Sequence, residues 1–154
     1  MLAMIIIGLG LVALALVLAS QVSQKHTPNA KVAYGADNDE LLLGRHCNDP
    51  LAGGTSDDLL LFGSNDIVLG GIDADHSGID EWIKPNASTV FTDFEPGQDV
   101  LIFSHDGPAP NLAIKDDQDG NAVLLVDGSV AVTFRDLAAA FLNESHLILQ
   151  QRKA

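Results

Sequence analysis

The chain has 154 residues, which suits one domain with a short appendage, and its formal net charge is −13. Its 21 acidic residues against eight basic ones argue against nucleic acid as a partner, because phosphate binding requires a basic patch. The single cysteine, Cys47, excludes an internal disulfide and a zinc site built from cysteines.

Residues 1–19 form an uninterrupted apolar stretch, MLAMIIIGLGLVALALVLA. As a helix this stretch would be about 28 Å long, close to the ~30 Å hydrocarbon core of a bilayer. A cleaved signal peptide is the alternative, but it would begin with basic residues and have a shorter apolar run. We therefore expect a transmembrane helix over residues 1–20 with the membrane as a partner, followed by a polar linker over residues 21–33.

Residues 35–75 repeat a short unit of glycine, a small polar residue, aspartate and an aliphatic residue. A period near nine residues is too short for a helical hairpin. It is typical of a coil of very short strands joined by turns rich in aspartate and glycine. The aspartates that mark the period are Asp39, Asp49, Asp57, Asp66 and Asp75.

Two repeat units make one turn of such a coil, so aspartates of alternate units should lie on the same edge. This spacing predicts one column containing Asp39, Asp57 and Asp75 and another containing Asp49 and Asp66. An aliphatic residue follows two positions after most of these aspartates and should enter the core. The pair Asp57-Asp58 offers two registers, so either aspartate of that pair is a candidate.

The segment GGTSDDLLLFGSNDIVLGG resembles the RTX, or haemolysin-type, calcium-binding repeat. The resemblance implies a parallel β-roll with Ca²⁺ between stacked turns, held by repeat aspartates and backbone carbonyls. Calcium prefers such an all-oxygen environment. The resemblance therefore implies a metal-ligand role for Asp39, Asp49, Asp57, Asp58, Asp66 and Asp75.

The repeats also depart from the family pattern. The fourth-position glycine, which can adopt positive φ, is replaced by Asp37, Cys47, Ser56 and Ser64 in successive units. Pro50 removes a backbone donor beside Asp49. A second interpretation therefore stays open, in which the coil persists but its aspartates are ordinary turn residues.

Repeats over residues 34–78 need a cap, because a short coil exposes apolar ends. Residues 79–154 are expected to supply a β-rich cap. The segment VFTDFEPGQDVLIF resembles the TDF-x-x-G-x-D segment that follows the repeats in many RTX proteins. The residues that match are Thr92, Asp93, Phe94, Gly97 and Asp99.

The cap should contain several strands joined by tight turns. Asp119-Gly120 and Asp127-Gly128, each between apolar runs, predict two hairpins. Good helix formers over residues 136–143 predict a short helix with Asp136 as its N-cap. The expected strands are 99–103, 111–115, 122–126, 130–134 and 146–149.

Together these features predict an all-β protein, a short parallel β-roll with a β-rich cap behind one transmembrane helix. H-E-x-x-H, G-x-S-x-G, P-loop and dinucleotide motifs do not occur, so we expect no enzymatic activity. The predicted function is a membrane-anchored calcium-binding module. The alternative is an accessory subunit of a membrane protein complex, in which the roll is independent of metal and other subunits bind the helix.

Two observations bear on the side of the membrane that the domain faces. Lys25 and Lys31 follow the predicted span, and positive residues favour the cytoplasmic side. Calcium, by contrast, is abundant outside cells. We expect a single-pass membrane protein whose soluble domain is periplasmic or extracellular.

Overall fold

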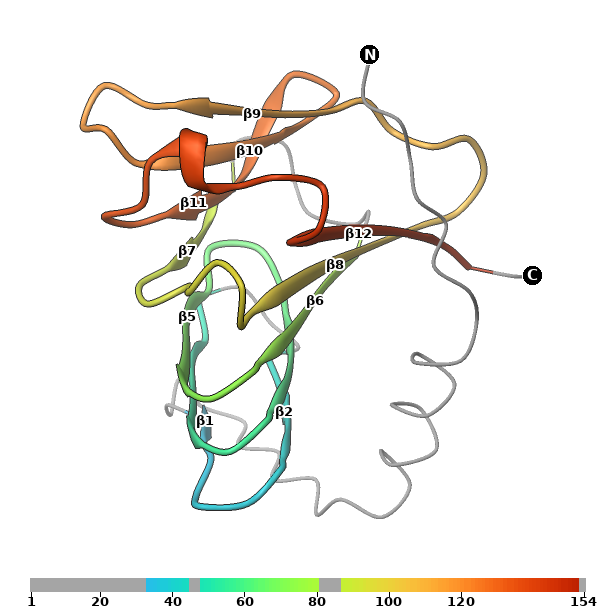
Figure 1. Ribbon diagram of the computed structural model, residues 1–154. Coiled ribbons are helices and arrows are strands. Elements are labelled where there is room, and N and C mark those ends of the chain that lie inside the picture. Colours follow the sequence, from blue (N-terminus) through green and yellow to red (C-terminus); the bar gives the residue numbers. More distant parts are fainter. Residues whose placement is uncertain (1–32, 45–47, 81–86, 153–154) are drawn as a thin grey trace.

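The computed structural model describes residues 33–44, 48–80 and 87–152, and these are built almost wholly from strands (Figure 1). The expected all-β class is confirmed. No helix in the described ranges is long and apolar enough to cross a membrane. The helix expected at residues 1–20 and nearly all of the linker lie outside those ranges, so both stay predictions.

Twelve strands and one short 3-10 turn make up the described part of the chain. The strands are β1 (Ala33–Tyr34), β2 (Leu41–Leu43), β3 (Pro50–Thr55), β4 (Leu59–Phe62), β5 (Ile67–Ile72), β6 (His76–Asp80), β7 (Thr89–Phe91), β8 (Val100–His105), β9 (Leu112–Asp116), β10 (Ala122–Val126), β11 (Ser129–Phe134) and β12 (Leu147–Gln151).

The strands form two sheets that face each other. The seven-stranded sheet has the order β1-β3-β5-β7-β11-β10-β9, and the five-stranded sheet has the order β12-β8-β6-β4-β2. From β1 to β8 the chain changes sheet after every strand, and neighbouring strands are parallel. This winding is the coil expected from the repeats, and it fills the lower half of Figure 1. We call β1–β8 the roll.

One turn of the roll takes 18 residues and the next takes 17. Leu41 of β2 pairs with Leu59 of β4, and Leu59 pairs with His76 of β6. The third turn is longer, since His76 pairs with Val100 of β8. The shortened second turn moves every following residue by one position relative to a strict 18-residue repeat.

The parallel winding continues past residue 78, where the boundary between repeats and cap was expected. β7 pairs with β5, and β8 pairs with β6. The strands β9, β10 and β11 then form an antiparallel meander, which joins the seven-stranded sheet through parallel pairing of β11 with β7. Roll and cap therefore share both sheets.

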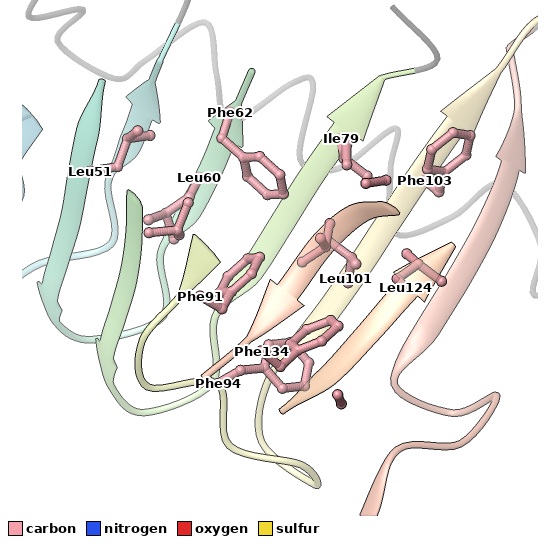
Figure 2. Close-up of a cluster of buried hydrophobic side chains, with 14 of the residues drawn as sticks. Leu51, Leu60, Phe62, Ile79, Phe91, Phe94, Leu101, Phe103, Leu124 and Phe134 are labelled. Carbon is pink, nitrogen blue, oxygen red and sulfur yellow. The ribbon is translucent and has the colours of Figure 1, made fainter. Parts of the chain in front are cut away.

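The core lies between the two sheets, where alternate side chains of each strand point inward. Leu51, Leu60 and Val68 of the roll are fully buried there. Figure 2 shows that Leu60 and Phe91, which come from different sheets, point into the same layer. Leu51 and Val68, two positions after Asp49 and Asp66, enter the core as the sequence predicts. After Asp57 the prediction is wrong by one residue, because Leu60 rather than Leu59 is buried.

Four phenylalanines join the roll to the cap. The Phe91 ring is 5.3 Å from Phe62 of the roll and 5.6 Å from Phe134 of β11, measured between centroids. Phe94, from the TDF segment, packs edge-on against Phe134 at 4.9 Å. Offset and edge-on aromatic pairs of this kind stabilise a core beyond the area they bury. Figure 2 shows Phe94 and Phe134 at the lower end of this cluster, with Phe91 between them and Phe62.

Both expected hairpins are present in the cap, between β9 and β10 and between β10 and β11. The helix expected over residues 136–143 is wrong. The structure has only the 3-10 turn η1 (Ala139–Phe141), and Asp136 does not cap it. Tertiary contacts override helix propensity here. Leu142 is buried in the core, and the Asp116 carboxylate accepts a hydrogen bond from the Ala139 amide.

Candidate metal-binding edge

The connections between β1 and β2, β3 and β4, β5 and β6, and β7 and β8 stack along one edge of the roll, the first edge. In three of these connections, a carboxylate accepts a hydrogen bond from a backbone amide of the preceding connection. Asp58 Oδ1 accepts the Glu40 amide at 2.9 Å, and Asp75 Oδ1 accepts the Asp58 amide at 2.9 Å. Asp99 Oδ1 accepts the Asp75 amide at 3.1 Å. The row of carboxylates therefore ties four successive turns together.

The carboxylates of this row point into the roll. Asp58 and Asp75 are only 2% and 1% exposed, and Asp99 is 6% exposed. Each lies two positions before an inward-facing residue of the following strand, so both side chains point to the same side. A buried carboxylate that is ionised requires hydrogen-bond donors or a cation to compensate for the water that it loses.

Two oxygens in this row lack such compensation. Asp58 Oδ2 and Asp75 Oδ2 are fully buried without a hydrogen-bond partner in the described structure. An unsatisfied buried acceptor costs roughly 1–3 kcal/mol, and more for a charged group. Asp99 differs, because its Oδ2 accepts a hydrogen bond from the Glu95 amide at 2.7 Å. The uncompensated charge is thus confined to the two middle turns.

A glycine lies against each of these oxygens. A Cβ built on Gly53 would lie 2.5 Å from Asp58 Oδ2 and closer still to the Gly70 carbonyl oxygen of the next turn. A Cβ on Gly70 would collide with Asp75 Oδ2 in the same way. Calcium is bound by carboxylate and carbonyl oxygens at about 2.3–2.6 Å. A carboxylate oxygen and a carbonyl oxygen of successive turns therefore lie close together against Gly53, so that one cation can contact both.

Burial also shifts the titration of these groups. It raises the pKa of Asp75 to about 7, with further increases from the Asp99 and Asp58 carboxylates and an opposing effect of the Asp58 amide. Burial raises the pKa of Asp58 to about 6. The pKa of Asp99 is raised by burial as well. The row is costly to ionise without a counter-charge, as expected for carboxylates gathered where a cation would bind.

The expected column of Asp39, Asp57 and Asp75 needs correction. Because the second turn of the roll takes 17 residues, Asp58 rather than Asp57 lies beside Asp75. Asp57 is exposed, and its carboxylate accepts the Ala74 amide at 3.0 Å. Asp39 is exposed too, and the residue that occupies the column in its place is Glu40.

The other column, Asp49 with Asp66, is brought together as expected. These residues lie on the opposite side of the roll, the second edge, formed in the described ranges by parts of the connections β2–β3 and β4–β5. Asp66 is fully buried, and burial raises its pKa to about 6. Its Oδ1 accepts the Asp49 amide at 2.8 Å, and its Oδ2 accepts the Gly63 amide at 2.6 Å.

Sequence reasoning missed Glu40 and Asp99 as members of the first column. A usable signal was present, because each carboxylate precedes a buried leucine by two positions, Leu42 and Leu101, as Asp58 does in its unit. The TDF segment contributes a further contact. Asp93 accepts the amides of Gly70 and Gly71 at 3.0 Å each, so it closes the third turn of the first edge.

The described residues contain no group of three or more histidine, cysteine, aspartate or glutamate side chains arranged to hold a metal ion. A cation at the first edge would therefore need backbone carbonyls beside single carboxylates. Gly54 and Gly71 suit this need. Both adopt positive φ, +119° and +114°, and this conformation turns the backbone at the point where the connections stack.

Comparison with solved structures supports the fold. The chain resembles the solution structure of the AlgE6R3 subunit from the Azotobacter vinelandii mannuronan C5-epimerase, with a TM-score of 0.58 and 22% sequence identity. The match covers 82% of this chain and 83% of that one. No protein-family model matches the sequence, and no curated protein matches it. The likeness shows a shared roll-like fold.

Proposed function

We propose that this chain is a non-catalytic calcium-binding β-roll module of the RTX type. The observation that carries the proposal is the pair of buried carboxylate oxygens, Asp58 Oδ2 and Asp75 Oδ2, which have no donor and lie against Gly53 and Gly70. The fold shared with the epimerase subunit is compatible with this function.

The first edge would bind calcium through carboxylates whose positions are set by hydrogen bonds between the turns. Bound calcium would supply the positive charge that the buried carboxylates lack. Asp58 and Asp75 tie their turns to neighbouring turns through Oδ1, so their Oδ2 atoms are held in position before any ion arrives. Because ionised carboxylates in adjacent turns repel each other, folding of this edge and ion binding are coupled.

The proposal includes the predicted membrane anchor. A transmembrane helix over residues 1–20 would leave the roll tethered by about a dozen residues, on the periplasmic or extracellular side where calcium is plentiful. Fractionation of cells with protease protection of the intact chain tests this part. Recovery of the full-length chain in the soluble fraction would contradict it.

The test of calcium binding is thermal unfolding of the full chain, monitored through the β-sheet signal in circular dichroism. We expect the melting temperature to rise on adding calcium and to fall again with a chelator, while magnesium has a much smaller effect because it dehydrates reluctantly. An identical melting temperature in calcium and in chelator would refute calcium binding.

One observation favours the second candidate function, an accessory subunit of a membrane complex. Three large apolar side chains on the outer face of the seven-stranded sheet are exposed, Tyr34 (68%), Ile67 (44%) and Leu69 (40%). Ala52 of β3 pairs with both Tyr34 and Leu69, so these side chains lie near each other. Exposed apolar clusters often mark protein interfaces. Purification of the chain in a complex of fixed stoichiometry would support this candidate.

A further inference from the structure

The two edges of the roll satisfy their buried carboxylates in different ways. On the first edge, Asp58 and Asp75 each have one oxygen without a donor. On the second edge, both oxygens of the equally buried Asp66 accept backbone amides, from Asp49 and Gly63. The Thr89 hydroxyl also donates to the Gly63 carbonyl oxygen. Protein donors therefore occupy the oxygens that would otherwise face a cation.

The glycines at the two edges show the same contrast. A Cβ built on Gly53, at the first edge, would meet Asp58 Oδ2 and a carbonyl oxygen. A Cβ built on Gly44, at the second edge, would meet Asp66 Oδ2 at 2.8 Å and a methyl group of Leu51 at 2.7 Å. A methyl group cannot bind a cation, so Gly44 lacks the second oxygen that lies against Gly53.

The ends of the first edge are closed as well. At one end, the Glu40 side chain reaches back within its own turn, and its Oε2 accepts the Ala36 amide. At the other end, the two Asp99 oxygens accept the amides of Asp75 and Glu95. Among the described turns, only the joint between the turn of Asp58 and the turn of Asp75 combines an unpaired carboxylate oxygen with a carbonyl oxygen of the next turn.

We propose that the described roll has a single cation-dependent joint, between the turns of Asp58 and Asp75, and that protein hydrogen bonds replace the cation at the second edge and at both ends of the first edge. This inference rests on the proposed calcium binding and adds where the ion binds and how many ions the described roll holds. Removal of calcium then loosens one joint, while the second edge keeps the two sheets connected.

Hydrogen exchange of the full chain, measured residue by residue in calcium and in chelator, tests this inference. We expect the amides of residues 53–58 and 70–75 to exchange at least about tenfold faster in chelator. The amides of Asp49 and Gly63 should change by less than about twofold. A calorimetric titration of the chelator-treated chain should find one calcium ion per chain.

Asp58→Asn and Asp66→Asn form a matched pair, because each replaces one buried carboxylate in a stacked turn. Asp58→Asn should weaken calcium binding at least about tenfold. Asp66→Asn should leave calcium affinity unchanged and lower the melting temperature equally in calcium and in chelator. If Asp66→Asn does not fold, Thr89→Val is the control at the second edge, because it removes the hydroxyl that donates to the Gly63 carbonyl oxygen.

Three results would overturn the single joint while leaving calcium binding intact. The first is a titration that finds two or more calcium ions per chain. The second is faster exchange of the Gly63 amide in chelator, to the same degree as the amides of the first edge. The third is a loss of calcium affinity in Thr89→Val as large as the loss in Asp58→Asn. Absence of both heat and any change in exchange on adding calcium would instead overturn the proposed function, and this inference with it.

Discussion

Asp58 and Asp75 differ from ordinary turn aspartates in the direction that their side chains take. A turn aspartate usually accepts nearby amides at the surface, as Asp57 does here from Ala74. Asp58 and Asp75 instead point inward and keep one buried oxygen unpaired. Their raised pKa values follow from this burial and give stability a defined dependence on pH.

The first prediction concerns pH. The pKa of Asp75 is raised from 3.8 to about 7, so between about pH 4 and pH 7 the folded chain binds more protons than the unfolded chain. The free energy of unfolding without calcium should therefore fall as pH rises through this window. Thermal melts in chelator should give a higher melting temperature at pH 5 than at pH 8, with a larger stabilisation by calcium at pH 8.

The general acidity of the chain would produce a slope of the same sign, so the control is a pair of variants. Asp75→Asn should flatten the pH dependence in chelator more than Asp119→Asn, whose aspartate is exposed in a hairpin turn. Equal slopes in the two variants would show that burial of Asp75 is not the cause.

The second prediction concerns a turn that lost its glycine. Asp73 has a φ of +83°, a region that costs a residue with a Cβ roughly 1–2 kcal/mol. Asp73→Gly should therefore raise the free energy of unfolding by roughly 0.5–1 kcal/mol, after the entropy that glycine adds to the unfolded chain. Gln118→Gly, at an exposed turn position without positive φ, should destabilise instead; chemical denaturation of both variants measures the difference.

At the scale of elements, the stacked turns of the first edge depend on close approach of backbone to backbone. Gly53→Ala places a methyl group against the Gly70 carbonyl oxygen and Asp58 Oδ2, both held in place by the stack. The third prediction is that Gly53→Ala loses measurable calcium binding and melts at a lower temperature. Gly78→Ala is the control, because its methyl group would meet only the end of the Leu61 side chain, which can rotate away.

The fourth prediction concerns the joint between roll and cap. Phe91 is buried and contacts the rings of Phe62, Phe94 and Phe134. Phe91→Ala should lower the free energy of unfolding by about 3–5 kcal/mol through the cavity that it creates. Phe141→Ala, at a side chain that is 66% exposed, should change it by less than about 0.5 kcal/mol. Similar losses in both variants would contradict the packing described here.

The sequence predicted the elements better than their register. Strand positions, both Asp-Gly hairpins and the inward residues Leu51 and Val68 follow from local patterns, because the alternation of a strand and the chemistry of a turn are local. The column assignment failed by one residue at Asp57-Asp58. Both aspartates precede a leucine by two positions, so only the 17-residue turn of the folded roll distinguishes them.

The expected helix over residues 136–143 failed for a related reason. Its composition favours a helix, but Leu142 packs in the core, and Asp116 at the end of β9 accepts a hydrogen bond from the Ala139 amide. Glu40 and Asp99 were missed because neither lies at the expected repeat position, although each precedes a buried leucine by two positions. Sequence spacing could not show which carboxylate oxygens lack a donor, since that depends on amides 17 to 24 residues away.

At the scale of the whole molecule, the described roll has buried carboxylates on both edges, unpaired oxygens on the first edge, and apolar packing at its junction with the cap. The core and the second edge connect the sheets without metal, so we expect the chain to keep β-structure in chelator but to be less stable there. A calcium-free chain with no β-sheet signal would mean that the second edge contributes less than its hydrogen bonds suggest.

The most direct test of calcium binding at the first edge is a crystal structure of the chain grown in calcium, with anomalous scattering used to locate the ion. We expect an anomalous peak about 2.3–2.6 Å from Asp58 Oδ2 and from the Gly70 carbonyl oxygen. A map with no peak there, in which donors from water or protein satisfy Asp58 Oδ2, would contradict it.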